Sequence, residues 1–456
     1  MTDTYLSRSL ETPSSQKKFT ISFWVKNSGA GDGSTRYFWG SYKGGAGDAS
    51  WLGLNCNGSG QFGITSWFGG INVVLSAEVK DPAAWSHIVL QVDTSQGSAA
   101  DRMKWYVNGV GPITALSSSS YPSQDTVFTW LESGATMTWG CTWNNTPATY
   151  GYMNGYLANC AYVDGQNIAP TVFGQTDSTT GEWKPKIVSG VTWGDSGSFL
   201  EFKNSGAMGT DTSGNSNTYT VTSAPTNFQT MDTPSNNFMT MNRLDIGTDN
   251  NTVTMSGLQV DAGSASGQAA EQHTRSTFAL ESGKWYWEMK VLQNSASIGL
   301  LTASDPINAT FANAPYNIIQ YTPGGEIRWR KSGSQTTKTT GIDSYTSNDI
   351  MMCALDMDNK RAYFGKNGVW QGDPTPDPAS SPSGAGQMAP LLSDYFYHAM
   401  SFDDTSASSG RSNWNFGSPL YSISSGNTDG NNYGNFEYAV PSGYYAVCTQ
   451  NINSYG

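Results

Sequence analysis

An aromatic and amide-rich run contains the residue types that recognise sugars. The segment from Trp139 to Tyr152 reads W-G-C-T-W-N-N-T-P-A-T-Y-G-Y. An aromatic ring lies against the apolar face of a sugar, while Asn and Asp side chains bind its hydroxyl groups. The run therefore predicts a carbohydrate-binding or surface-binding loop that contains Trp143, Asn144, Asn145, Tyr150 and Tyr152.

A second cluster with the same chemistry follows a Gly-rich approach and consists of Trp67, Phe68 and Asn72. Both clusters also fit packing in a core or between subunits, which accounts for most Trp side chains in aromatic-rich sandwiches. The sequence leaves these two interpretations open.

Two patterns look catalytic but lack the partners that their chemistry needs. Glycoside hydrolysis uses two carboxylates on either side of the scissile bond. Asp356 and Asp358 have the spacing of one strand face, but no third acid follows and no Glu is available as the general acid. The string G-D-S-G at residues 194–197 copies the surroundings of a protease nucleophile, yet neither His87 nor His398 has the matching histidine context. We predict no catalytic residues and no enzyme activity.

A nine-residue pattern that occurs twice indicates the elements that carry these loops. Residues 102–110 read R-M-K-W-Y-V-N-G-V, and residues 361–369 read R-A-Y-F-G-K-N-G-V. An alternating apolar run that ends in Asp precedes each copy, at Asp93 and at Asp356. Asn-Gly suits a two-residue type I′ turn because both central residues need a positive φ. The repeat predicts one antiparallel β-domain around each copy.

The composition is that of a turn-rich β protein. The chain has 456 residues, 51 of them Gly, with 12% aromatic and only 13% charged residues. This length exceeds what one hydrophobic core organises, and helical periodicity is hard to find. We predict an all-β fold of two antiparallel β-sandwich (jelly-roll) domains, residues 1–170 and 246–456, joined by an irregular Ser/Thr/Asn/Gly-rich connector at residues 171–245.

Charge and hydropathy exclude several classes of partner. The net charge of −12 argues against nucleic acid, which requires clustered Lys and Arg. No apolar stretch approaches the roughly 20 residues needed to cross a bilayer, and the N-terminus lacks a signal-peptide pattern. We expect a soluble protein without membrane insertion. Buried free thiols are favoured over disulfides or zinc for the widely spaced Cys56, Cys141, Cys160, Cys353 and Cys448.

The first strand of the N-terminal domain spans residues 19–26. Its apolar residues Phe19, Ile21, Phe23 and Val25 alternate with Thr20, Ser22, Trp24 and Lys26, which predicts a strand buried on one face only. Further strands at short spacing with Gly-rich turns are typical of a sandwich. They are predicted at residues 37–40, 50–55, 61–66, 72–75, 86–93, 104–108, 136–141 and 155–163.

These strands resemble a concanavalin A-like or laminin-G-like lectin domain. The resemblance rests on four segments in the right order, namely residues 19–26, 85–90, 105–110 and 155–164. Sandwiches of this kind often hold calcium through loop aspartates, since a hard cation takes oxygen ligands. Solvated turn residues remain the simpler explanation of the same aspartates, because nothing in the sequence fixes their geometry. The resemblance therefore makes calcium a candidate cofactor at Asp32, Asp48, Asp93 and Asp164.

The second domain resembles SPRY, with a Pro-rich insertion at residues 372–390 that departs from the family. By analogy with the family, its partner surface includes the loop at residues 305–316 together with Trp329 and Arg330. The matching segments are residues 282–291, 298–304, 352–358, 364–368, 413–417 and 440–447.

The connector is similar to connectors in structural proteins of tailed phages, many of them marine, where a laminin-G-like domain precedes a second β-domain. The resemblance implies a non-catalytic virion fibre or spike protein, made in the host cytoplasm and displayed on the particle, that attaches to host-surface glycans or proteins. It also implies contacts with other virion proteins and a homotrimer. The alternative is a capsid decoration or tail-adaptor protein, with a glycoside hydrolase on the same fold as a minor alternative.

Overall fold

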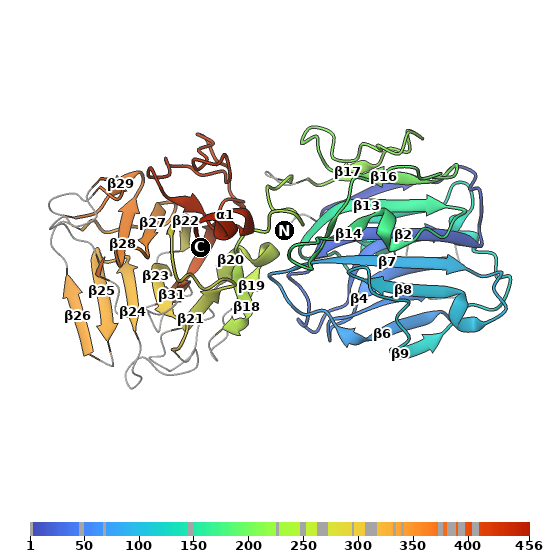
Figure 1. The fold of residues 1–456 in the computed structure, drawn as a ribbon, viewed down its shortest axis with the longest axis horizontal. Helices are drawn as coiled ribbons and strands as arrows, with labels where there is room; N and C mark the ends of the chain where they lie inside the picture. Colours follow the sequence, from blue (N-terminus) through green and yellow to red (C-terminus); the bar gives the residue numbers. More distant parts are fainter. Residues whose placement is uncertain are drawn as a thin grey trace. The chain divides into compact units, whose positions relative to one another are not determined.

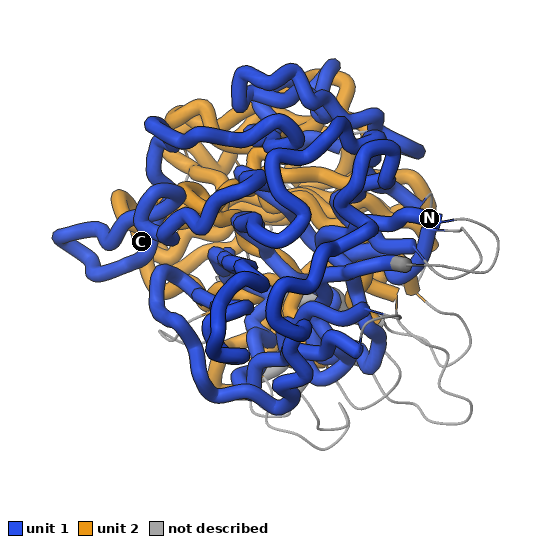
Figure 2. Tube along the Cα trace, turned by 90° about the vertical axis from the view of Figure 1, so that its right-hand side faces the viewer, with its two compact units in different colours: residues 1–229 blue, residues 230–456 orange. Residues whose placement is uncertain are grey.

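The protein is almost entirely β-strand. The computed structural model describes residues 3–44, 50–66, 70–143, 149–224, 228–246, 252–261, 272–293, 296–305, 317–331, 334–338, 342–372, 377–380, 389–390, 397–403 and 410–456. Backbone contacts divide the chain into two compact units, residues 1–229 and 230–456 (Figure 2). Each unit contains two large, mainly antiparallel sheets, which confirms the predicted all-β sandwich fold.

The first unit has an eight-stranded and a five-stranded antiparallel sheet. The order of the larger sheet is β17 (Thr220–Thr222), β1 (Tyr5–Ser9), β10 (Thr136–Trp139), β3 (Arg36–Lys43), β4 (Ser50–Cys56), β5 (Gln61–Ser66), β6 (Asn72–Glu78) and β9 (Leu116–Ser120). The order of the smaller sheet is β16 (Ser198–Leu200), β13 (Tyr156–Asp164), β2 (Lys18–Lys26), β7 (Trp85–Asp93) and β8 (Met103–Val107), and Figure 1 shows its long strands running side by side. Two hairpins are separate from both sheets, β11 (Thr142–Trp143) with β12 (Thr149–Tyr150) and β14 (Gly174–Thr176) with β15 (Trp183–Pro185). Short 3-10 turns span Ala99–Asp101, Thr129–Leu131 and Pro170–Val172.

The core of the first unit lies between these two sheets. Along β2, Phe19, Ile21, Phe23 and Val25 alternate toward it and are almost fully buried. Phe19 stacks on Trp39 of the opposite sheet with ring centroids 6.2 Å apart. Strand alternation in the sequence thus selects the face that builds the core.

The prediction that β2 is buried on one face only is wrong. Its other face is buried as well, because the β14–β15 hairpin covers the five-stranded sheet. The ring of Trp24 stacks on His87 at 4.8 Å, and Trp183 of β15 lies parallel to the same imidazole at 6.0 Å. Ser22 and His87 on this face are therefore paired inside the protein and are not available to a ligand.

The second unit repeats the two-sheet plan. One sheet has the order β18 (Met241–Ile246), β21 (Gln272–Ser276), β31 (Tyr397–Asp403), β23 (Ala296–Thr302), β24 (Ile318–Thr322), β25 (Glu326–Lys331) and β26 (Ser334–Lys338). The other has the order β19 (Thr252–Thr254), β20 (Gln259–Asp261), β32 (Arg411–Asn415), β22 (Lys284–Gln293), β27 (Ile350–Asp356), β28 (Arg361–Lys366) and β29 (Val369–Trp370), with β30 (Ala389–Pro390) on β28 and β33 (Tyr445–Ala446) parallel to β22. A 3-10 turn spans Met255–Gly257, and α1 spans Thr449–Tyr455 near the C-terminus.

The residues expected to form a connector divide between the two units. Residues 171–229 belong to the first unit, where they supply the β14–β15 hairpin and two strands. Strand β16 pairs with β13, and β17 pairs with β1, so each large sheet gains an edge strand. Residues 230–245 belong to the second unit, in which β18 pairs with β21.

Candidate functional site

Aromatic side chains gather on the outer face of the eight-stranded sheet. The β11–β12 hairpin lies over β3 and β4 on this face. There Tyr42 stacks on Trp143 with ring centroids 5.4 Å apart, and Tyr37 contacts Tyr150 at 6.0 Å and Trp51 at 5.7 Å. We call these five residues, Tyr37, Tyr42, Trp51, Trp143 and Tyr150, the aromatic patch.

Two glycines in the sheet allow the hairpin to approach so closely. A Cβ atom at Gly40 would lie 2.6 Å from the Thr142 hydroxyl oxygen, and one at Gly53 would lie 2.6 Å from the Tyr37 ring. The Tyr37 amide also donates a hydrogen bond of 2.7 Å to the Gly151 carbonyl, just after the hairpin. The backbone therefore holds the hairpin against the sheet.

The aromatic patch has a buried layer and an accessible layer. Tyr37 and Trp51 are only 6% and 8% exposed, whereas Tyr150 is 51% exposed. Tyr42 and Trp143 are half-buried. A ligand can reach the Tyr150 ring, which is supported from beneath by the buried Tyr37 ring.

A strip of uncharged polar side chains continues from the patch across the sheet. We define the polar strip as Asn55, Thr65, Asn72 and Ser118. The Asn55 amide donates to the Thr65 hydroxyl at 3.0 Å, and the Asn72 amide donates to the Ser118 hydroxyl at 3.0 Å. The strip crosses β4, β5, β6 and β9, which is three strand spacings or roughly 14 Å.

The patch and the strip present a neutral surface. Burial raises the pKa of Tyr37, the Thr65 hydroxyl partly offsets this, and nearby Tyr150 adds to the rise. The phenol therefore stays protonated near neutral pH. At the edge of this face, Arg36 is paired with Asp32 at 2.9 Å. Such a surface offers ring faces and hydrogen-bonding groups but no charge.

The structure brings three of the residues predicted from the aromatic run together. Trp143 and Tyr150 belong to the patch, and Tyr152 lies beside it, with its ring 6.2 Å from that of Tyr5. Asn144, Asn145, Trp67 and Phe68 lie outside the described residues.

The sequence prediction missed Tyr37, Tyr42 and Trp51. They lie within strands whose alternation marks a core, and only the pairing of β3 with β4 shows which side chains point outward. The available signal was parity. Tyr37 and Tyr42 lie two and three residues from buried Trp39, on the opposite parity once the β-bulge in β3 is included, and Trp51 lies next to buried Leu52.

Of the partner surface predicted for the second unit, residues 306–316 lie outside the described residues. Trp329 of β25 is partly buried against the core of that unit, and the side chain of Arg330 lies outside the described part of the chain.

The aspartates considered for calcium are bound to protein groups. Asp32 pairs with Arg36, and Asp93 pairs with Lys18 at 3.0 Å. Asp164 accepts backbone N–H groups of Ser15 and Ser196 at 3.0 and 3.1 Å. Asp48 lies outside the described residues. Within the described ranges, no three His, Cys, Asp or Glu side chains are grouped so that they could hold a metal ion.

His87 and Ser22 are in contact, but not in the arrangement of a nucleophile and its base. The Trp183 indole N–H donates to His87 Nδ1 at 3.0 Å, so the neutral imidazole carries its proton on Nε2. Nε2 then donates to the Ser22 hydroxyl at 2.8 Å. Burial lowers the pKa of His87 to about 3, so the ring stays neutral. The imidazole cannot take a proton from Ser22.

The G-D-S-G string forms a structural turn. Its Ser196 hydroxyl donates to the Glu11 carbonyl at 3.1 Å, and its Ser196 amide donates to Asp164. Asp356, considered for hydrolysis, is fully buried and paired with Lys284 at 3.0 Å. These groups stabilise the fold at the positions where the structure places them.

Comparisons with known proteins relate the first unit to a broad superfamily. Residues 2–161 match the family model of the concanavalin A-like lectin/glucanases superfamily. A search of curated proteins finds no match. Among solved structures, the chain is similar to the SPRY domain of human HERC1, with 13% identity over 38% of this chain and 96% of that chain and a TM-score of 0.29. It is also similar to the PSpry domain of TRIM65, with 12% identity over 38% of this chain and 89% of that chain and a TM-score of 0.28.

A search for membrane-spanning helices gives a negative result. In the part of the chain that the structure describes, no helix combines the length and the apolar character needed to cross a bilayer.

Proposed function

We propose that the chain is a non-catalytic binding protein whose first unit recognises uncharged glycans through the aromatic patch and the polar strip. The observation that carries the proposal is the 51% exposed ring of Tyr150, supported by the buried Tyr37 ring beneath it. Laminin-G-like domains are commonly ligand-binding or adhesion modules, which agrees with this role.

The physical basis is a rigid ring beside fixed hydrogen-bonding groups. A ring in a fixed place loses little conformational freedom on binding, so more of the contact energy appears as affinity. The exposed Asn72 and the half-buried Thr65 and Ser118 can replace the water around sugar hydroxyls. Asn55 is only 3% exposed, and its amide instead orients the Thr65 hydroxyl. No residue of the patch or the strip carries a carboxylate, so this surface lacks the pair that glycoside hydrolysis requires.

The biological setting that we propose is a virion fibre or spike that attaches to a host-surface glycan or protein. It is supported by the order of the predicted domains and by the resemblance of residues 171–245 to phage connectors. In this setting the protein is a homotrimer that also contacts other virion proteins. A mass measurement on the purified chain at low concentration is expected to give the mass of a trimer. The mass of a monomer would contradict this part of the proposal.

An array of immobilised neutral oligosaccharides tests the binding function. Tyr150→Ala is expected to weaken the strongest signal at least tenfold, because a lost ring contact is worth roughly 1.4 kcal/mol or more. Tyr150→Phe keeps the ring and should retain binding. Ile187→Ala, at a residue that is 89% exposed elsewhere on the first unit, is the matched control.

Two outcomes would contradict the proposal. One is an array without any glycan signal for the unmodified protein. The other is equal binding by Tyr150→Ala and the unmodified protein. In the second case, burial of Tyr150 in purified particles would favour the decoration or adaptor role, in which the same ring packs against a neighbouring subunit.

A further inference from the structure

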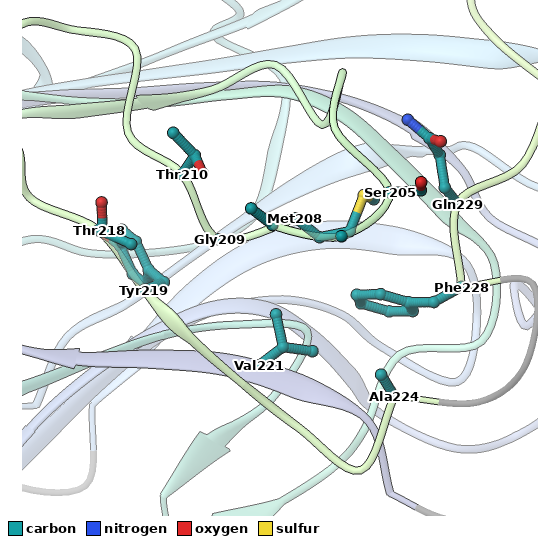
Figure 3. A pocket seen from close by; sticks show the side chains of 12 residues that line it. Ser205, Met208, Gly209, Thr210, Thr218, Tyr219, Val221, Ala224, Phe228 and Gln229 are labelled. Carbon is teal, nitrogen blue, oxygen red and sulfur yellow. The ribbon is translucent and has the colours of Figure 1, made fainter.

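A cavity of about 590 Å³ lies at the C-terminal end of the first unit and takes no part in the aromatic patch. It is lined by residues 205–210 and by Thr218, Tyr219, Val221, Ala224, Phe228 and Gln229. Figure 3 shows Met208, Val221 and Phe228 gathered around one part of the cavity, with Thr210 and Thr218 at the other. The size is in the range of small-molecule sites, which are roughly 300–1,000 Å³.

Short backbone contacts build the floor of the cavity. Successive turns fold residues 204–210, with the Ala207 amide donating to the Asn204 carbonyl at 3.0 Å. The Tyr219 amide then donates to the Gly209 carbonyl at 2.8 Å. A Cβ atom at position 209 would lie only 1.9 Å from the Tyr219 carbonyl oxygen, so only Gly permits this approach.

Tyr219 forms a fixed wall. Its side chain is 3% exposed, and its hydroxyl is used inside the protein, where it contacts Met137 Sδ at 3.1 Å and the Ser198 hydroxyl at 3.2 Å. The Arg8 guanidinium lies 5.2 Å from the ring centroid. The ring is therefore held in place and offers the cavity an apolar surface without its hydroxyl group.

None of the described residues that line the cavity is acidic or basic. Ser205, Thr210 and Thr218 bring hydroxyl groups. The side-chain amide of Gln229 donates through Nε2 to the Phe202 carbonyl at 2.6 Å, and Oε1 of the same side chain remains as an acceptor. An ionised ligand would lose hydration here without gaining a countercharge, whereas a neutral ligand would not.

We propose that this cavity is a second binding site, for an uncharged hydroxylated molecule that carries one apolar ring or short chain. The apolar group lies among Met208, Val221 and Phe228, and the hydroxyl groups lie toward Thr210 and Thr218. The site is distinct from the aromatic patch, because the two share no residue. Its existence does not depend on the proposed function.

Calorimetric titration of the full chain with phenyl β-glucoside tests the site, because this probe joins one ring to one neutral sugar. Ala224→Trp and Ala224→Phe each place a large side chain in the cavity from an exposed wall position. Each is expected to weaken binding at least tenfold with an unchanged unfolding temperature. Phenyl β-glucuronide, which adds one carboxylate, should bind at least fivefold more weakly than the glucoside.

The titration is repeated with Tyr150→Ala, which weakens binding at the aromatic patch at least tenfold, so the heat of binding that remains in this variant belongs to the cavity. No heat of binding from Tyr150→Ala would overturn the proposal. The proposal would also be overturned if both variants with a filled cavity bound the glucoside as tightly as the protein with an open cavity. Tighter binding of the glucuronide than of the glucoside would overturn it as well.

Discussion

The three strands β2, β7 and β8 of the first unit and the three strands β22, β27 and β28 of the second have the same register. Lys18 pairs with Asp93 across β2 and β7, and Lys284 pairs with Asp356 across β22 and β27. Each pair makes an ion pair of 3.0 Å at the same end of its sheet. The repeated sequence pattern therefore corresponds to a repeated physical device.

The turns at the opposite ends of these strands match as well. Asn108 and Asn367 both have φ of 48°, and each is followed by a Gly with positive φ. The side-chain oxygen of each Asn accepts a backbone N–H at 2.8 Å, from His87 in one unit and from Ile350 in the other. The predicted type I′ turns are confirmed, and each Asn also ties the turn to the neighbouring strand.

The two sets of three strands differ on their outer faces, at the position four residues after each Lys. Ser22 lies there in the first unit, in contact with His87. Glu288 lies there in the second, fully buried, and accepts five hydrogen bonds, two of them from the backbone amides of Glu437 and Tyr438. Turn and ion pair thus specify the shared scaffold, while the segment that covers each sheet determines its polar chemistry.

The largest expected effect is at Glu288. Glu288→Ala leaves five buried donors without an acceptor and should lower the free energy of unfolding by about 4 kcal/mol, while Ser22→Ala should cost less than about 1 kcal/mol. Hydrogen exchange in β22 and β2 of the full chain measures the two units separately. Equal losses of unfolding free energy for Glu288→Ala and Ser22→Ala would show that the polar groups of the two outer faces contribute equally to stability.

Acid should affect the first unit through His87. Burial lowers the pKa of His87 to about 3 from an ordinary value of 6.5, so the unfolded chain binds the proton first as the pH falls. Stability present above pH 6.5 is therefore lost on acidification, by about 3 kcal/mol between pH 6.5 and pH 4.

Glu288 should act in the opposite sense. Burial raises its pKa above the ordinary 4.5, and the hydrogen bonds it accepts only partly offset this. Its contribution is fully present below that value and is lost as the pH rises through the folded pKa. Protection factors for hydrogen exchange in β2, measured across this pH range, check the His87 effect. Protection in β2 that does not change with pH would contradict it.

The two ion pairs should be equivalent. Asp93→Ala and Asp356→Ala each remove a buried carboxylate and leave donors unpaired, but Lys18 and Lys284 are 39% and 28% exposed and regain water. We expect a loss of about 2 kcal/mol in each unit, measured by denaturant unfolding. A loss of unfolding free energy in only one unit would show that the two ion pairs are not equivalent.

The smallest expected effect is at the turns. Asn108→Ala and Asn367→Ala each lose one hydrogen bond and place a Cβ-bearing residue at positive φ, which should cost about 1–2 kcal/mol. Asn→Gly at the same positions removes the hydrogen bond without the strain, so it should cost less. Thermal unfolding of the four variants separates the two contributions, and an Asn→Gly variant as unstable as its Asn→Ala counterpart would exclude strain as a cause.

Local patterns in the sequence predicted the scaffold well. Alternation placed the first strand at residues 19–26, and the structure has β2 at Lys18–Lys26. The Asn-Gly turns were also predictable, because their geometry depends on two adjacent residues. Strands β16 and β17 were not, since each has three residues and forms only by pairing with a distant strand.

The candidate site was predictable only in part. Trp143 and Tyr150 could be found because they lie in an aromatic run outside any alternating strand. Tyr37 could not, since its outward direction depends on the bulge between Tyr37 and Trp39 and on strand pairing. The cavity likewise depends on Gly209 meeting Tyr219, a contact between residues that no local pattern connects.

The most direct test of the central claim is oxidative footprinting of the full chain, with and without the strongest neutral oligosaccharide from the array. We expect protection of Tyr150 and Trp143 in the first unit and no change at Tyr445 and Tyr455 in the second. Protection confined to the second unit, or none at Tyr150 when the glycan is bound, would contradict it.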